Sequence, residues 1–493
     1  MSSPQVAYEA TEPFAFFDDV RVPYRVVHGL PRPAPPLEAT GALWATTDPR
    51  ATLWWCRALE RPARERVTGR FAVAGIPLAG RVVTDEVIDR SLDMSAWRRD
   101  ATVTDVDGQP VSSVRRHRNG SVLLPFDPGE VLTTLWSERY RELGRSRVRS
   151  TVRGLAVRGY YAVRPVLPRP VQLRLRQAFT RVQARPDFPR WPIEDCVADL
   201  TTWLFDLVGE FAGEPVPSID PWPDGRRWAL VLTHDVETGA GFAQREMLRT
   251  PERDLGLLSS WNLVAERYEV DDREVRALQD EGCEIGVHGL RHDGKDLGSR
   301  RLLRRRLPAM RLAAERWGAH GFRSPATQRK WEWMPELGFA YDTSTPDTDP
   351  YEPQPGGCCT TRPFLHGEMV ELPITLPQDH TVFAVLDHPD GQVWLDKTGH
   401  IRARVGMALV LTHPDYATDP RVTESYRGLL AAYHDDPTAW HALPREVATW
   451  WRERAGSHLE RRNGTWCVVG PAAHRAKVRL GAERVPPPPP PMR

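Results

Sequence analysis

Short apolar runs that end in polar residues recur between residues 228 and 416, and stretches with helical spacing separate them. A run of this kind indicates a buried strand. Strands that alternate with helices predict an α/β domain, as a parallel barrel or open sheet, whose functional side chains gather at the carboxyl ends of the strands. The expected strands are WALVLTHD, CEIGVHG, HGFRSPA, FAYDTST and MALVLTHPDY, and the expected helices are DREVRALQDEG and SRRLLRRRLPAMRLAAERWG, the second interrupted or kinked at Pro308.

The chain has 493 residues, which is enough for two or three domains. A Pro-rich connector, EPVPSIDPWPDG, indicates a boundary near residue 220. We therefore predict an α+β domain of unknown role over residues 1–220, a catalytic domain over 221–435, a C-terminal helix and hairpin extension over 436–485, and a disordered poly-Pro tail over 486–493.

Both flanking regions carry elements of their own. In the N-terminal region we expect strands within residues 69–83 and 120–126 and helices over 127–143, 171–183 and 193–213. Near the C-terminus we expect helices over 426–436 and 444–456, and a small hairpin formed by 463–470 with 471–480.

Charge and hydropathy exclude several classes of function. A net charge of +1 gives no electrostatic case for a nucleic-acid partner. No stretch approaches the roughly 20 apolar residues of a membrane helix, and the N-terminus lacks a basic start followed by an apolar core, so we expect a cytoplasmic protein. The six cysteines include no CxxC pair and are expected to be free thiols.

Two histidines follow the apolar run EIGV directly. His288 and His292 are four residues apart, and on one helical turn such residues share a face, so both imidazoles can reach one metal ion. The spacing alone also suits two surface histidines. The position after a strand favours the metal site, because an α/β sheet presents its ligands there.

Two carboxylates follow the run WALVLT. Asp235 and Glu237 are two residues apart, and in an extended chain such side chains point the same way. One carboxylate and two histidines can hold a zinc-type ion and leave positions open. The other carboxylate can take a proton from water that attacks a carbonyl. Taken alone, the pair also suits a solvated loop.

Two further groups complete the set of candidate residues. His413 follows the apolar run MALVLT and can protonate a leaving amine. The same position also suits a loop histidine whose hydrogen bond is only structural. Arg323, in FRSP, can pair with Asp235 and keep it ionised, or can form an ordinary salt bridge.

In this order the motifs resemble the polysaccharide deacetylase family, whose members act on chitin, peptidoglycan and related N-acetyl sugars. The family pattern T-[FH]-D-D, H-[ST]-x-x-H, R-x-P, D-x-S and L-x-H is matched here by THDV, HGLRH, RSP, DTS and LTH. The resemblance covers roughly residues 226–420. No single motif is specific, whereas five in order are.

The resemblance implies a distorted (β/α) barrel and a divalent metal ion, usually zinc. It implies that Asp235 is the base, that His288 and His292 are metal ligands, that Arg323 orients the base, and that His413 is the acid. A saccharide is the implied substrate, and Asp342, in the DTS motif, is a further candidate for binding it.

Three positions depart from the family pattern. The metal-binding Asp of the family falls on Val236, so Glu237 is the expected replacement. Gly289 stands where the family has Ser or Thr, and the lost hydroxyl is expected to loosen the loop. Ala326 stands where the family has an aromatic residue. Its backbone N–H can still bind an oxyanion, and Trp331 and Trp333 are the candidates for the missing aromatic wall.

The favoured function is therefore a metal-dependent hydrolase that removes an N-acetyl group from a saccharide or glycan precursor. A metal amidohydrolase of the same fold that acts on a non-sugar C–N bond is one alternative. A catalytically inactive saccharide-binding protein is the other, because Val236 cannot bind a metal ion. The sequence leaves the exact substrate and the oligomeric state open.

Overall fold

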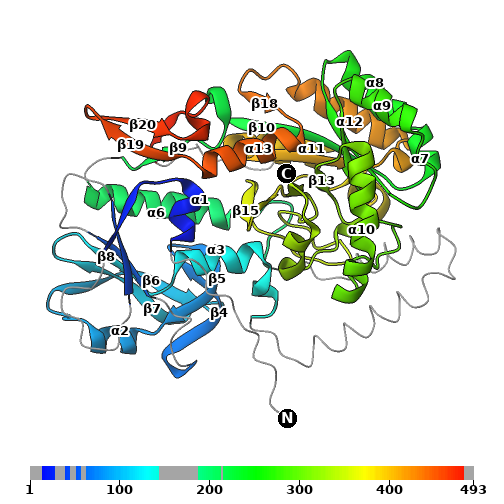
Figure 1. Cartoon of the computed structure of the whole chain (residues 1–493). Coiled ribbons are helices and arrows are strands. Elements are labelled where there is room, and N and C mark those ends of the chain that lie inside the picture. Colours follow the sequence, from blue (N-terminus) through cyan, green and yellow to red (C-terminus); the bar gives the residue numbers. More distant parts are fainter. Residues whose placement is uncertain are drawn as a thin grey trace, which may run out of the picture.

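The computed structural model describes residues 14–27, 39–44, 52–56, 63–143, 187–212 and 215–481. Within them the chain forms an N-terminal part on an eight-stranded sheet and a second part on a nine-stranded sheet (Figure 1). The expected helix at 171–183 and the poly-Pro tail lie outside the described residues. No helix in the described part of the chain is long and apolar enough to span a membrane.

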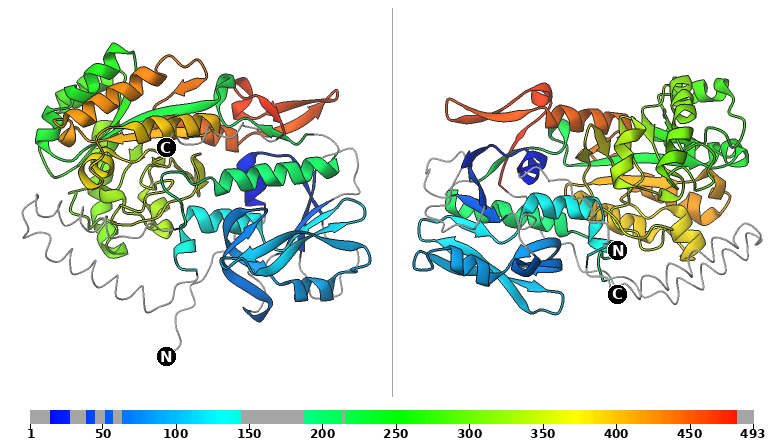
Figure 2. Two further views of the ribbon diagram at one scale, coloured as in Figure 1. Left: turned by 180° about the vertical axis from the view of Figure 1, so that it is seen from behind. Right: turned by 60° about the horizontal axis from the view of Figure 1, so that its bottom comes forward.

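The N-terminal sheet has the order β1-β2-β3-β8-β7-β6-β4-β5 and is antiparallel except for the pair β3–β8. The helices α3 and α6 pack against β5 (Figure 2). The strands are β1 (Tyr24–Val27), β2 (Ala39–Trp44), β3 (Leu53–Cys56), β4 (Arg66–Val73), β5 (Ile76–Val83), β6 (Trp97–Asp105), β7 (Pro110–His117) and β8 (Val122–Leu124). The helices are α1 (Ala15–Val20), α2 (Asp85–Ser91), α3 (Pro128–Trp136) and α6 (Cys196–Ala212).

The predicted helix over 127–143 is confirmed at its start and is too long at its end. The Asp127 side chain caps α3 by accepting from the backbone N–H groups of Gly129 and Glu130, and Pro128 occupies the first turn. The helix ends at Trp136, because Glu138 adopts a left-handed conformation with φ of 58° before a short 3₁₀ turn.

The second sheet confirms the prediction of a parallel α/β domain. Its strand order is β15-β16-β14-β13-β12-β11-β10-β17, and β18 adds to the start of β10. Only β15 and β16 pair antiparallel. The strands are β10 (Trp228–Val236), β11 (Ser259–Leu263), β12 (Glu284–Val287), β13 (Gly321–Phe322), β14 (Tyr341–Asp342), β15 (Phe364–His366), β16 (Met369–Glu371), β17 (Met407–Thr412) and β18 (Ala439–His441).

Helices connect these strands and cover the outer face of the sheet (Figure 1). They are α7 (Gly239–Ala243), α8 (Glu246–Asp254), α9 (Asp272–Asp280), α10 (Arg300–Trp317), α11 (Gln392–Ala403) and α12 (Pro420–Tyr433). The helix α13 (Pro444–Ala455) follows β18 and packs instead against the opposite face, in the apolar cluster that includes Ala229 and Val231. The expected interruption at Pro308 is wrong, because α10 is one helix from Arg300 to Trp317; the alternative, a kink at Pro308, stays a prediction. Pro308 lies on the exposed side of α10, where solvent can reach the carbonyl group that its missing N–H leaves free.

The side chains of β10 alternate between two apolar environments, one on each face of the sheet. Trp228, Leu230, Leu232 and Val236 belong to the apolar layer between the sheet and the helices α8, α10 and α12. Ala229 and Val231 point to the opposite face, into a second apolar cluster with Leu409 and Leu411 of β17. Successive side chains of a strand point to opposite faces. Thr233, Asp235 and Glu237 therefore continue the inner face.

The ring of strands does not close by a continuous backbone ladder, because β15 and β17 end the hydrogen-bonded path. The chain after β16 closes part of the gap instead. The Thr375 hydroxyl donates to the carbonyl oxygen of Met407 at 2.7 Å and accepts from the N–H of Leu409 at 2.7 Å. Leu376 N–H donates to the Leu409 carbonyl at 3.2 Å. The sheet is thus curled and mostly parallel, and a complete barrel stays a prediction.

The C-terminal segment pairs differently from the expectation. A hairpin forms between β19 (His458–Arg462) and β20 (Thr465–Val469), while β21 (Val478–Leu480) pairs with β9 (Pro217–Ile219). The predicted hairpin of 463–470 with 471–480 is therefore wrong. Asn463 and Gly464 both have positive φ, and an Asn-Gly pair of this kind is the preferred two-residue turn of a hairpin.

Candidate active site

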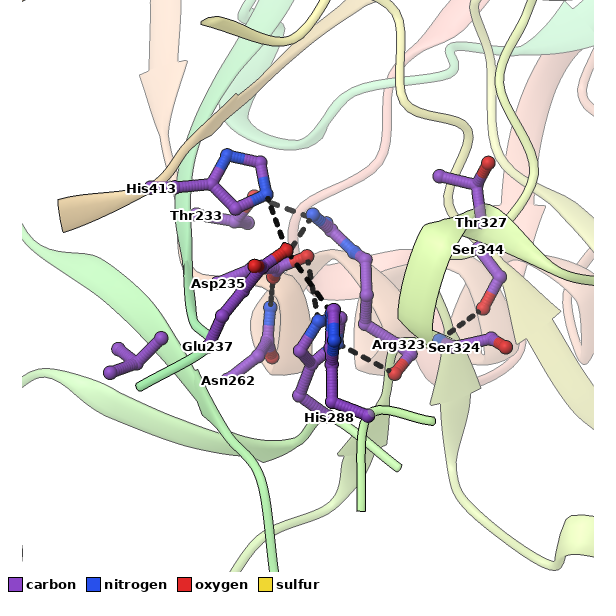
Figure 3. Close-up of polar contacts among 12 residues, drawn as sticks. Thr233, Asp235, Glu237, Asn262, His288, Arg323, Ser324, Thr327, Ser344 and His413 are labelled. Carbon is purple, nitrogen blue, oxygen red and sulfur yellow. Dashed lines mark hydrogen bonds and ion pairs between the residues drawn. The ribbon is translucent and has the colours of Figure 1, made fainter. Parts of the chain in front are cut away.

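The candidate residues meet at the carboxyl ends of four parallel strands. Asp235 lies near the end of β10, His288 follows β12, Arg323 follows β13, and His413 follows β17 (Figure 3). Glu237, His288 and His292 each offer one ligand atom, and these three atoms lie within 4.8 Å of one another. The structure thus brings together the three residues that the sequence suggested as metal ligands.

The two histidines belong to a loop and not to a helical turn, so that part of the expectation is wrong. Residues 288–292 have no helical structure, and both Gly289 and His292 adopt positive φ, of 67° and 50°. This winding of the loop brings the two imidazole rings to a centroid distance of 5.0 Å. The conformation of the loop, and not a helical turn, therefore brings His288 and His292 together.

Hydrogen bonding prepares His288 to bind a metal ion. Its Nδ1 atom lies 3.0 Å from the Arg323 carbonyl oxygen, which can only accept, so Nδ1 carries the proton and Nε2 has a free lone pair. Burial lowers the pKa of His288 to about 4, which keeps the ring neutral. The Nε2 atoms of His288 and His292 are both buried without a hydrogen-bond partner. Such orphaned nitrogens, aimed at one carboxylate, fit a divalent cation.

Gly289 fits this loop because a side chain there has no room. A Cβ atom would lie 2.5 Å from Asp296 Oδ2 and 2.7 Å from the Pro325 ring. Asp296 holds the loop instead of a hydroxyl at residue 289, since its Oδ2 accepts from Leu290 N–H at 3.1 Å and its Oδ1 from Arg306 at 2.7 Å. The missing Ser or Thr therefore does not leave the loop without an anchor.

We expect Gly289→Ser to lower the free energy of unfolding by about 2 kcal/mol or more, because left-handed φ costs a non-Gly residue about 1–2 kcal/mol and the clash adds to it. Gly294→Ser is the matched control. Gly294 has φ of 69°, but its Cβ would meet only Gln328 Nε2, at 3.3 Å. Chemical denaturation of both variants measures the difference, and equal destabilisation would show that the contacts at Gly289 do not matter.

Glu237 joins the histidines from the inner face of the first strand. Its Oε1 lies 3.1 Å from His292 Nε2 and 4.0 Å from His413 Nε2. Its backbone N–H donates to Asp415 Oδ2 at 3.0 Å, which fixes the chain where β10 ends. Burial opposes ionisation of Glu237, but the neighbouring histidines outweigh it and hold its pKa below the usual range.

Asp235 lies beside this group and is held through one oxygen. Its Oδ1 accepts from Asn262 Nδ2 at 2.8 Å and lies 3.4 Å from Arg323 Nη1. Its Oδ2 lies 3.7 Å from His288 Nε2. Burial opposes ionisation, but the charges of Arg323 and His413 and the hydrogen bond from Asn262 keep the pKa of Asp235 below its usual value. The carboxylate is ionised and its Oδ2 has fewer partners than Oδ1, so Oδ2 can accept a proton.

Arg323 is fully buried and is fixed by three motif residues. Its Nε donates to Thr343 Oγ1 at 2.7 Å, and its Nη2 donates to Thr233 Oγ1 at 3.1 Å. With Asp235 on Nη1, the guanidinium is bound on each of its three nitrogens. It can therefore hold Asp235 in a fixed orientation.

His413 is held by a buried carboxylate. Its Nδ1 lies 2.6 Å from Asp379 Oδ1, and its backbone N–H donates to Asp379 Oδ2 at 2.7 Å. Burial lowers the pKa of His413, but the Asp379 charge and hydrogen bond outweigh it and raise the pKa to about 10. His413 is thus protonated at neutral pH, as a proton donor must be.

We expect Asp379→Asn to lower kcat by roughly 10- to 100-fold with KM little changed, because it removes the group that orients and charges His413. Steady-state kinetics measures both constants. Asp390→Asn, on an exposed loop, is the control for the same chemical change. An unchanged kcat in Asp379→Asn would mean that His413 does not act as the acid.

The residues suggested for substrate binding lie outside this group. The Trp331 ring stacks on His366 at a centroid distance of 3.6 Å, and Trp333 packs against the outer apolar layer. Asp342 is fully buried, and its carboxylate accepts from the Ser344 hydroxyl and N–H. Ala326 follows Arg323 closely in the chain and adopts a left-handed conformation with φ of 53°. Strained backbone of this kind is common at functional sites.

Three site residues were not found by sequence reasoning. Asn262 binds Asp235, Asp379 binds His413, and Asp415 binds the Glu237 backbone and the Thr238 hydroxyl. Asp415 could have been found, since it follows His413 by two residues at a strand end. Asn262 and Asp379 carry no local pattern, because the parallel sheet brings them to the site from distant segments.

No protein-family model and no curated protein matches the chain. Several solved structures do. The solved structures that the chain matches include polysaccharide deacetylases. One of them comes from Mycobacterium smegmatis and carries the description of a polysaccharide deacetylase. It is 20% identical to this chain, the match covers 47% of this chain and 92% of that chain, and the TM-score is 0.38.

Two other solved structures show the same range of similarity. A peptidoglycan deacetylase from Bacillus subtilis is 12% identical, with 48% of this chain and 95% of that chain covered and a TM-score of 0.31. An allantoinase is 16% identical, with 47% and 93% covered and a TM-score of 0.37. All three TM-scores are below 0.5, so what the site can do follows from its own side chains.

Proposed function

We propose that the protein is a metal-dependent hydrolase that removes an N-acetyl group from a saccharide or glycan precursor. One observation carries the proposal. Two buried imidazole nitrogens without hydrogen-bond partners converge with a carboxylate, next to an ionised aspartate and a protonated histidine. This combination of a ligand set, a base and an acid is what amide hydrolysis needs.

Glu237, His288 and His292 would hold the divalent ion. Two nitrogen ligands and one oxygen ligand suit zinc, and three protein ligands are the usual number in a catalytic zinc site. When bound, the ion would polarise the carbonyl of the substrate and lower the pKa of a water molecule. Val236 takes no part, because its side chain lies in the apolar layer behind the strand.

Asp235 and His413 divide the proton transfers between them. Asp235 takes a proton from water as the water oxygen forms a bond to the amide carbon. Protonated His413 gives its proton to the amide nitrogen as the C–N bond breaks, so that acetate and a free amine leave. Arg323 and Asn262 keep Asp235 in position during these steps.

The choice of an N-acetylated sugar rests on the family resemblance of the motifs. We assign the binding of the sugar to the region of Ala326 and Trp331, and not to Asp342, which is fully buried against Ser344, or to Trp333, which packs in the outer apolar layer. The Ala326 N–H is proposed to bind the oxyanion, and Trp331 is proposed to supply an apolar surface for the sugar ring.

Metal analysis of the purified protein, combined with a substrate panel, tests the proposal. We expect one divalent ion per chain and release of acetate from N-acetylglucosamine oligomers, both lost in His288→Ala. Hydrolysis of small amides or imides without activity on N-acetyl sugars would favour the amidohydrolase alternative. A protein that binds no metal ion after incubation with zinc would favour a saccharide-binding protein without catalysis.

A further inference from the structure

A small cavity lined by arginines lies among elements from both ends of the chain, none of which carries a residue of the candidate active site. Figure 1 shows these elements, α1, α6, β9 and α13, side by side. The cavity has a volume of about 60 Å³ and is bordered by α1, α6, β9, α13 and β21. One water molecule needs about 10–15 Å³ measured in this way. The cavity therefore has room for a group of about four or five heavy atoms.

The charged side chains of the lining are mostly positive. Arg362, Arg404, Arg454 and Arg479 line the cavity, and Asp19 is the only acidic residue of its described lining. Arg362 donates through Nε and Nη2 to the backbone carbonyls of Val405 and Arg404, at 3.1 and 3.2 Å. Two other arginines bind carboxylates outside the lining. Arg404 binds Asp195 and Asp199, and Arg479 binds Asp220.

Arg454 is the residue that most needs a counterion. It is 5% exposed, and its Nη1, Nη2 and Nε donate at 2.8, 3.1 and 3.2 Å to the backbone carbonyls of Asp19, Ile219 and Asp220. No carboxylate of the described residues lies within ion-pair distance of it. Its guanidinium also lies 5.1 Å from the Trp451 ring centroid, which holds it at the cavity wall.

The surroundings of Arg454 are unfavourable to its charge. Burial is the main cause that lowers its pKa, to about 9, and the positive charges of Arg21, Arg362 and Arg479 add to the effect, which Asp19 opposes. At neutral pH the guanidinium still carries its proton. A buried charge is costly, and the carbonyl oxygens and the single carboxylate of Asp19, which several arginines share, compensate it only in part.

From this cavity and its charges we infer a binding site for a small oxyanion of the phosphate type, held by Arg454 and Arg362 between α6 and α13. The five heavy atoms of phosphate match the room in the cavity, and guanidinium groups bind phosphate oxygens well. The oxyanion belongs to free phosphate or to the phosphoryl group of a larger ligand. The site is independent of the proposed hydrolase activity.

Calorimetric titration of the full chain with sodium phosphate, at constant ionic strength set by sodium chloride, tests the inference. We expect saturable binding of one phosphate per chain. Ala198→Leu, which fills the cavity from α6 without changing its charge, should abolish binding. Arg454→Gln should weaken it at least ten-fold, and Asp19→Asn, which removes the one acidic lining residue, should strengthen it several-fold. Arg98→Gln, exposed on the N-terminal sheet, is the charge-matched control and should bind as the unaltered chain does.

The same titration with a hexose phosphate separates the two sources of the oxyanion. Tighter binding than that of free phosphate would assign the site to a phosphorylated ligand, and equal or weaker binding would assign it to phosphate itself. Absence of saturable binding by both would overturn the inference. Binding that survives Ala198→Leu would also overturn it, because the phosphate would then lie elsewhere. If Arg454→Gln does not fold, Ala198→Leu and Asp19→Asn still decide the question.

Discussion

The Asp235→Asn variant is expected to lose about 10³-fold in kcat, within the 10²–10⁴-fold range that a general base contributes. The substitution keeps the shape of the side chain and removes the charge that accepts the proton. The amide that replaces the carboxylate can still contact Arg323 and Asn262, so the strand end should keep its geometry. Stopped assays of acetate release would measure the loss.

The metal content separates a lost base from a damaged site. Asp235→Asn should still bind one divalent ion, because Asp235 is not among the three converging ligand residues. Asp280→Asn, at the exposed end of α9, controls for the chemical change and should leave kcat unaltered. A kcat for Asp235→Asn within ten-fold of the original would show that another group takes the proton.

Glu237→Ala is expected to lose the metal ion as well as the activity. It removes the only carboxylate that converges with His288 and His292 among the described residues. We expect metal affinity to fall by at least about 100-fold, since even loss of an outer-shell partner costs 10–100-fold. Equilibrium dialysis against zinc gives the affinity without depending on turnover.

Glu269→Ala, an exposed acid on the loop after β11, is the control for Glu237→Ala and should bind metal normally. The comparison with Asp235→Asn is informative in itself. If Asp235→Asn loses the metal and Glu237→Ala keeps it, then the two carboxylates have exchanged the roles proposed for them, and Glu237 is the candidate base.

The parallel α/β part of the fold and most of the candidate site could be predicted from sequence. Side chains two residues apart in an extended chain point to the same face, so the sequence predicts that Thr233, Asp235 and Glu237 lie on one face. The His288 and His292 pair was predicted for the wrong local reason. Its loop depends on Gly289 packing against Asp296 and Pro325, and such contacts are tertiary.

Partners that come from distant segments could not be predicted. Asp379 reaches His413 across 34 residues and Asn262 reaches Asp235 across 27, and both contacts exist only when neighbouring strands align. The C-terminal pairing failed for a similar reason. The strand β21 pairs with β9 across more than half of the chain, whereas sequence patterns indicate only local turns such as Asn463–Gly464.

The outward position of Val236 limits how the ligand set can change. Its side chain has no exposed surface and packs with the apolar layer that α8, α10 and α12 cover. An aspartate at this position would place a charge among hydrocarbon side chains, at a cost of several kcal/mol. Val236→Asp is therefore disfavoured in this chain, although it would restore two adjacent acidic residues. The proposed metal ligand is instead the glutamate one residue further on, and we expect variants that keep the proposed function to keep that spacing.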